Sequence, residues 1–104
     1  MGNRVSISFK DEKTKKESIT LFSHWDGMEL VKEATIYIEN LKTEIDKKEN
    51  KRNYPLNRLE PDTIIIDFIR ELTKDLERIE SNYYLGRNEN EGDNSDNGHH
   101  IIKL

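Results

Sequence analysis

The segment VSISFK, residues 5–10, shows the pattern from which the rest of the architecture can be predicted. The apolar side chains of Val5, Ile7 and Phe9 alternate with two serines and a lysine. Strict alternation places every apolar side chain on the same face of an extended strand, because successive side chains point to opposite faces. We therefore predict a half-buried β-strand with one apolar face and one polar face.

A second short strand follows a charged connection. The connection is KDEKTKKE, residues 10–17, and the strand is SITLFS, residues 18–23, in which Ile19 and Leu21 share a face. Two short strands around a polar connection are typical of a β-hairpin. The connection contains no Asn-Gly pair, so we expect a longer, solvated loop rather than a tight turn.

Two helices are predicted after this hairpin. Apolar residues recur at spacings of three and four from Met28 to about residue 49, which indicates a single apolar stripe of a helix. A longer stripe begins near Asp62 and continues to Tyr83. We expect Gly86 to end that run.

The last segment, HHIIKL at residues 99–104, is predicted to be a short strand. The order of elements is then β-β-α-α-β, an α+β fold in which two helices pack on one face of a small, mostly antiparallel sheet. A chain of 104 residues fits a single domain, here with an acidic loop at about 86–98. If successive elements alternate in direction, residues 23–28 and 84–99 meet at one edge, where we expect any binding site.

Composition limits the classes of function. The chain is 37% charged and carries a net charge of −4, and about a quarter of it is Leu, Ile, Val or Phe, above the roughly 20% of disordered chains. The absence of cysteine excludes disulfides and thiolate chemistry. A pI of about 5.4 disfavours binding to duplex nucleic acid. Without a membrane-length apolar run or the apolar core of a signal peptide, we expect a cytoplasmic protein with no membrane partner.

The segment SHWDG begins at Ser23, between the second predicted strand and the first predicted helix. Ser23, His24 and Trp25 are candidate ligand-binding residues, because hydroxyl and imidazole groups orient a ligand while an indole supplies flat apolar contact. A local alternative is a capping box at the start of the helix, formed by Asp26 and Glu29, with Trp25 in its hydrophobic staple.

The segment GDNSDNGHH, residues 92–100, is the most unusual in the chain. Asp93, Ser95 and Asn97 match positions one, three and five of an EF-type calcium loop, which makes them candidate ligands of a divalent cation. Position twelve, normally a glutamate, is Leu104, and a strand rather than a helix is expected next. The alternative is an ordinary turn, since Asp, Asn and Gly stabilise turns without any ion.

A different cation site would combine Asp93 or Asp96 with His99 and His24. Carboxylate and imidazole together suit Zn²⁺, Mn²⁺ or Fe²⁺ better than Ca²⁺. Such an ion activates water for hydrolysis. The sequence completes no known catalytic arrangement, because it has neither a nucleophile-elbow serine nor a glycine-rich phosphate loop. Binding is therefore favoured over catalysis, and no catalytic residue is assigned.

Two further residues are candidates for contact with a ligand. Arg70, with Lys74 one helical turn later, offers positive charge to an anion, although an ordinary solvated helix face explains both residues. Tyr84 follows Tyr83 and precedes the acidic loop, so its ring is available for stacking on a planar ligand.

Together, LFSHWDG at 21–27 and GDNSDNGHH at 92–100 resemble a group of small uncharacterised prokaryotic and viral proteins. Members of that group carry an S-H-W-x-G stretch early and a G-D-N-S-D-N-G-H stretch near the C-terminus. The group has no established activity. The resemblance covers most of the chain, and it implies one shared site made by Ser23, His24, Trp25, Asp93, Asp96 and His99.

The sequence supports three hypotheses about function. The first is a module that binds a small polar ligand or a protein partner, with a nucleotide-sequestering protein as one example. The second is a hydrolase that depends on a divalent metal ion held by Asp93, Asp96, His99 and His24. The third is a structural or oligomeric protein, such as a homodimer, in which the acidic loop binds nothing.

Overall fold

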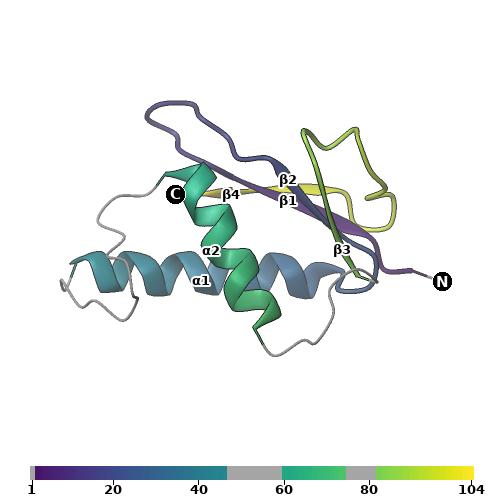
Figure 1. The fold of residues 1–104 in the computed structure, drawn as a ribbon, viewed down its shortest axis with the longest axis horizontal. Helices are drawn as coiled ribbons and strands as arrows, with labels where there is room; N and C mark the ends of the chain where they lie inside the picture. Colours follow the sequence, from purple (N-terminus) through teal and green to yellow (C-terminus); the bar gives the residue numbers. More distant parts are fainter. Residues whose placement is uncertain (1, 47–59, 75–81) are drawn as a thin grey trace.

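The structure is a computed structural model that describes residues 2–46, 60–74 and 82–104. The elements in these residues are, in chain order, β1 (Val5–Lys10), β2 (Thr20–Ser23), α1 (Met28–Asp46), α2 (Pro61–Thr73), β3 (Tyr83–Gly86) and β4 (His99–Lys103). Figure 1 shows α1 and α2 against the sheet that the strands form. The predicted α+β class and β-β-α-α-β order are confirmed, and β3 is an additional strand within that order.

β1 lies inside the sheet and pairs on both sides, in the strand order β3-β2-β1-β4. β1 pairs antiparallel with β2, and β2 pairs antiparallel with β3, so the sheet is mostly antiparallel as predicted. β4 runs parallel to β1, with Ser6 opposite His99 and Phe9 opposite Ile102. Because β3 and β4 are the two edge strands, the connection between them has to cross the whole sheet.

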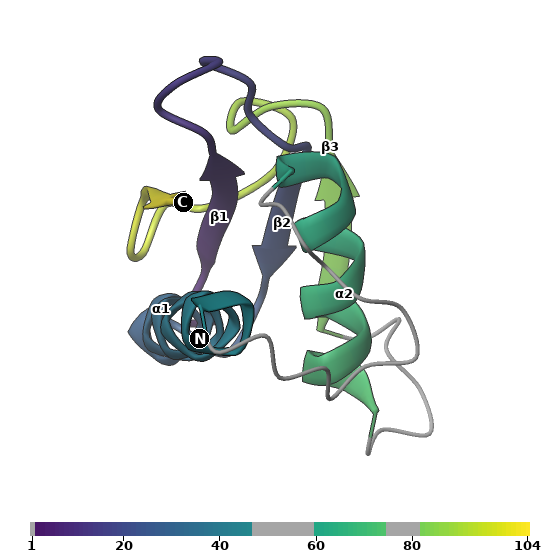
Figure 2. The ribbon, with the colours of Figure 1, turned by 90° about the vertical axis from the view of Figure 1, so that its left-hand side faces the viewer.

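The apolar face of β1 carries the core, as the alternation predicts. The side chains of Val5, Ile7 and Phe9 are fully buried in one cluster with residues of both helices. The ring of Phe9 meets Phe68 of α2 edge-on, with 5.5 Å between ring centroids, and lies 6.3 Å from Tyr37 of α1. Figure 2 shows both helices against the strands. The apolar positions of β1 therefore determine which face the helices cover.

The opposite face of the sheet is polar and aromatic. We call it the outer face, and its side chains from β1, β2 and β3 include Ser6, Ser8, Thr20, Phe22 and Tyr84. Phe22 stacks on Tyr84 with 4.9 Å between ring centroids. Residues 87–98, which connect β3 to β4, lie over this face and are called the covering loop (Figure 1). On the outer face, the side chains of Ser6, Ser8, Thr20 and Phe22 are almost completely buried, whereas Tyr84 is only partly buried.

The strand β3 corrects the predicted extent of the second helix. Tyr83, which the helical stripe would include, lies in β3 and pairs with Ser23 of β2. Tyr83 and Tyr84 are compatible both with the apolar face of a helix and with a strand, and their hydrogen-bonded pairing with β2 makes this segment a strand. Gly86 ends a strand rather than a helix. The part of the predicted helix at 75–81 lies outside the described residues.

The helices begin close to where the sequence predicts. α1 starts at Met28, and its predicted end near residue 49 lies outside the described residues. α2 starts with Pro61, a favourable first residue because the amide that proline lacks would be unpaired there. Within the described ranges, no helix is both long enough and apolar enough to cross a membrane.

Gly92→Ala tests whether the covering loop is packed tightly on the outer face. A Cβ atom at Gly92 would lie 2.7 Å from ring carbons of both Phe22 and Tyr84, so the loop or the rings would have to move. We expect the free energy of unfolding, measured by urea denaturation, to fall by about 1–3 kcal/mol. Asn90→Ala, at an exposed position of the same loop, is the control and should change it by less than about 0.5 kcal/mol. Equal stability of the two variants would contradict this packing.

Candidate functional site

The two segments that the sequence singles out lie side by side where β2 ends and β3 begins (Figure 1). The ring of His24 lies 5.0 Å from the ring of Tyr84, centroid to centroid. The backbone amide of Asp93 donates to the hydroxyl of Tyr84 at 2.8 Å. We call this surface the junction, and we define it by His24, Trp25, Tyr84 and Asp93.

Ser23 and Asp26 hold the junction together. The buried hydroxyl of Ser23 donates to the side chain of Asn82 at 3.0 Å and accepts the backbone amide of Asp26 at 3.1 Å. The Asp26 carboxylate accepts hydrogen bonds from Asn82 and from the hydroxyl of Tyr83. The predicted capping box is therefore wrong, because the amide and carboxylate of Asp26 bind these partners instead of Glu29 and the helix amides.

The acidic residues of the covering loop bind the segment that leads into β1. The backbone amide of Arg4 donates to the Asp96 carboxylate at 2.9 Å, and the Arg4 guanidinium lies 3.3 Å from Asp93. The backbone amide of Ser95 donates to Asp93 at 3.1 Å. The hydrogen bonds from Ser95, and then the charges of Arg4 and His24, hold the pKa of the Asp93 carboxyl below its usual value.

Asn97 completes this attachment, since its side chain donates to the Arg4 carbonyl at 3.0 Å. A turn therefore accounts for the observed contacts of Asp93, Ser95 and Asn97 without an ion.

The second cation site predicted from the sequence consists of His24, Asp93, Asp96 and His99. Among the described residues, no three of these four side chains bring their ligand atoms within 4.8 Å of one another.

Trp25 and Arg70, the remaining ligand candidates, lie in different surroundings. Trp25 is 58% exposed at the junction, although its backbone amide is held by Asn82 at 3.1 Å. Arg70 is exposed on α2, which packs on the face of the sheet opposite to the outer face. The structure therefore brings Trp25 to the junction and gives Arg70 no contact with it.

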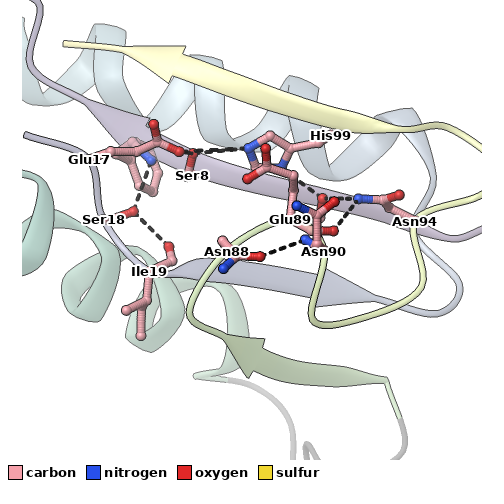
Figure 3. A network of polar contacts seen from close by, with 11 residues as sticks. Ser8, Glu17, Ser18, Ile19, Asn88, Glu89, Asn90, Asn94 and His99 are labelled. Atoms are coloured by element: carbon pink, nitrogen blue, oxygen red, sulfur yellow. Dashed lines mark hydrogen bonds and ion pairs between the residues drawn. The ribbon is translucent and has the colours of Figure 1, made fainter. Parts of the chain in front are cut away.

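A cluster of titratable side chains that the sequence did not single out lies on the outer face (Figure 3). Glu17 precedes β2, Glu89 lies in the covering loop and His99 opens β4. Each offers a donor atom, and the three atoms lie within 4.8 Å of one another. No motif or periodicity marks Glu17 or Glu89, because both lie in charged connections of a chain with 21 acidic residues.

The polar positions of β1 form the floor of this cluster. The hydroxyl of Ser8 donates to Glu17 at 2.7 Å and lies 3.2 Å from Nε2 of His99. The hydroxyl of Ser6 lies 2.8 Å from Nδ1 of the same ring and accepts the side-chain amide of Asn94 at 2.9 Å. Both serines are fully buried, so they restrict the position of the imidazole.

No protein-family model, curated protein or solved structure matches this chain. The resemblance to small prokaryotic and viral proteins therefore stays a prediction.

Tyr83→Phe tests the hydrogen bond that joins Tyr83 to Asp26. Burial first, and then the bond to the Asp26 carboxylate, raise the pKa of the Tyr83 phenol. Because the folded-state pKa is raised, the stabilisation is fully present below the unfolded-state pKa of about 10 and is lost as pH rises through the folded-state pKa. At neutral pH we expect the variant to be less stable by about 1–2 kcal/mol, since Tyr83 is only half-buried.

Urea denaturation of both proteins at several pH values measures this difference. The stability advantage of the wild type should stay constant up to about pH 9 and shrink above about pH 10. An advantage that grows with pH would contradict the direction of the pKa shift.

Proposed function

We propose that this chain is a small binding module that holds a planar, polar ligand at the junction. The observation that carries the proposal is the packing of the His24 ring on Tyr84, 5.0 Å between centroids, with the exposed Trp25 as the next residue in the chain. Rings at a surface supply large, flat contact area and lose little conformational freedom when they bind. A heteroaromatic ring such as a nucleobase fits this kind of surface.

Hydrogen bonds around the junction support the proposal, because they hold its residues in place without a ligand. The Tyr84 hydroxyl accepts the amide of Asp93, and the backbone amides of His24 and Trp25 both donate to the Asn82 side chain. A site whose residues are already ordered loses less conformational entropy on binding than a flexible one.

The charges near the junction restrict the class of ligand. Arg4 forms ion pairs with both Asp93 and Asp96, so its positive charge is already compensated. Burial, followed by the charges of Asp26 and Glu29, raises the pKa of Glu33 near the start of α1, so these three carboxyl groups lie near one another there. A polyphosphate would be repelled by these carboxylates. The sequestering role proposed from the sequence is therefore best supported for a nucleoside or another ligand of low negative charge.

Trp25 provides the test, because it is the only tryptophan in the chain. Titration with adenosine, guanosine, cytidine and uridine should change its fluorescence saturably for at least one nucleoside. The matching triphosphate should bind more weakly. His24→Ala should weaken binding about fivefold or more, which corresponds to a loss of about 1 kcal/mol of stacking.

Arg70→Ala is the control, because Arg70 lies on α2, away from the junction residues. It should bind the nucleoside as the wild type does, and the Tm values of both variants should show that they fold. If none of the four nucleosides changes Trp25 fluorescence up to millimolar concentration, the proposed ligand class is wrong.

We retain the cytoplasm as the expected location, and the proposal includes no catalytic step.

A further inference from the structure

We propose that Glu17, Glu89 and His99 bind one divalent transition-metal ion, such as Zn²⁺ or Mn²⁺, on the outer face of the sheet. The three donor atoms lie within 4.8 Å of one another, and Figure 3 shows the side chains of Glu17 and His99 close to that of Glu89, which belongs to the covering loop. The site is separate from the junction and from the turn that resembles a calcium loop. It does not depend on the ligand proposed above.

The spacing of the donors suits an ion after small side-chain rotations. Ligands of Zn²⁺ lie about 2.0–2.2 Å from the ion, so two ligands of a tetrahedral site are about 3.4 Å apart. Nε2 of His99 and the nearer oxygen of Glu17 are already 3.8 Å apart. The side chain of Glu89 forms no hydrogen bond or ion pair within the described part of the chain, so it is able to rotate toward them.

The donor set indicates which class of ion would bind. One imidazole nitrogen with two carboxylates suits Zn²⁺, Mn²⁺ or Fe²⁺, whereas Ca²⁺ and Mg²⁺ prefer oxygen ligands alone. Glu17 and Glu89 are partly open to solvent, and three protein ligands leave room for water on the ion. The same openness gives an ion a path into the site.

The charges at the cluster also favour a cation. In the described residues neither Glu17 nor Glu89 is ion-paired with a lysine or an arginine, and Nε2 of His99 lies 3.8 Å from the Glu17 carboxylate. Two carboxylates this close repel each other unless a positive charge lies between them. A divalent ion would supply that charge.

The serines of β1 hold the His99 ring so that Nε2 faces Glu17. The hydroxyl of Ser6, 2.8 Å from Nδ1, is able to accept a hydrogen bond from Nδ1–H or to donate one to an unprotonated Nδ1. Without an ion these contacts are satisfied when Nε2 donates to Ser8, whose own proton goes to Glu17, and Ser6 donates to Nδ1. An ion at Nε2 requires the other tautomer, in which Nδ1 carries the proton and donates to Ser6, as in metal-bound histidines. Ser8 donates to Glu17 and orients the second ligand.

A buried hydroxyl on the same face is an independent observation that supports the site. Thr20 is 1% exposed, and its Oγ1 has no hydrogen-bond partner among the described residues. Buried hydroxyls without a partner are rare. The next residue, Leu21, is paired with Ile7 and faces the helices, so Thr20 faces the outer side, as Ser8 does. The pairing of Ile7 with Leu21 also brings Thr20 next to Ser8, which binds Glu17, so Thr20 faces the side on which a water molecule of the ion would lie.

Calorimetric titration of the EDTA-treated protein with ZnCl₂, MnCl₂ and CaCl₂ tests the proposal. We expect one ion per chain, with Zn²⁺ bound more tightly than Mn²⁺, and Mn²⁺ more tightly than Ca²⁺. Glu17→Gln and Glu89→Gln preserve side-chain shape but remove a charged ligand, and each should weaken Zn²⁺ binding at least about tenfold. Glu12→Gln is the matched control in the β1–β2 connection and should bind Zn²⁺ as the wild type does.

A thermal melt of each variant separates loss of the site from loss of the fold. Without metal, the Tm of both glutamine variants should be no more than a few degrees from that of the wild type, because Glu17 and Glu89 are exposed and a glutamine at position 17 keeps an oxygen that accepts from Ser8. Saturating Zn²⁺ should raise the Tm of the wild type and of Glu12→Gln but not of the two ligand variants.

Two results would overturn the proposal. One is the absence of saturable binding of both Zn²⁺ and Mn²⁺, and the other is wild-type affinity in Glu17→Gln and Glu89→Gln. If Asp93→Asn abolished Zn²⁺ binding while Glu89→Gln did not, the ion would lie in the turn at 92–98 instead of on the outer face.

Discussion

The rest of the structure depends on the burial of β1 on both of its faces. One face presents Val5, Ile7 and Phe9, which need apolar cover, and the two helices supply it. The other face presents Ser6 and Ser8, which are also fully buried. A buried hydroxyl costs free energy unless it is hydrogen-bonded, so the outer face needs a cover that brings polar partners with it. This requirement explains why a polar segment, and not a third helix, lies there.

The covering loop satisfies that requirement, and its composition follows from it. Asn94 donates to Ser6, and the ring of His99, where the loop enters β4, lies against both serines. Asp96 and Asn97 bind the backbone of Arg4, just before β1 begins. Crossovers between parallel strands usually contain a helix, but this one connects the two edge strands without one. Side-chain hydrogen bonds to the β1 segment take the place of helix packing.

Periodicity predicted the elements wherever one face is apolar and the other polar, as in β1 and in α1 from Met28. It failed at Tyr83, because the same aromatic residue fits a helix stripe and a strand, and only pairing with β2 distinguishes them. Glu17 and Glu89 could not be predicted, since the crossover that brings them together is not visible in local sequence. For Asp93 the sequence left a calcium loop and an ordinary turn as alternatives, because the residue types that form turns are also those that bind calcium.

The covering loop also connects the two proposed sites. It carries Glu89 at the cluster and Asp93 at the junction, where the amide of Asp93 binds the hydroxyl of Tyr84. An ion that joined Glu89 to Glu17 would restrict the loop further than the contacts of Asp93 with Tyr84 and Arg4 already do, and a ligand at the junction would then meet a more ordered loop. Binding to an ordered site loses less conformational entropy, and the coupling free energy between two sites is reciprocal. Each site would therefore strengthen binding at the other without any direct contact between ion and ligand.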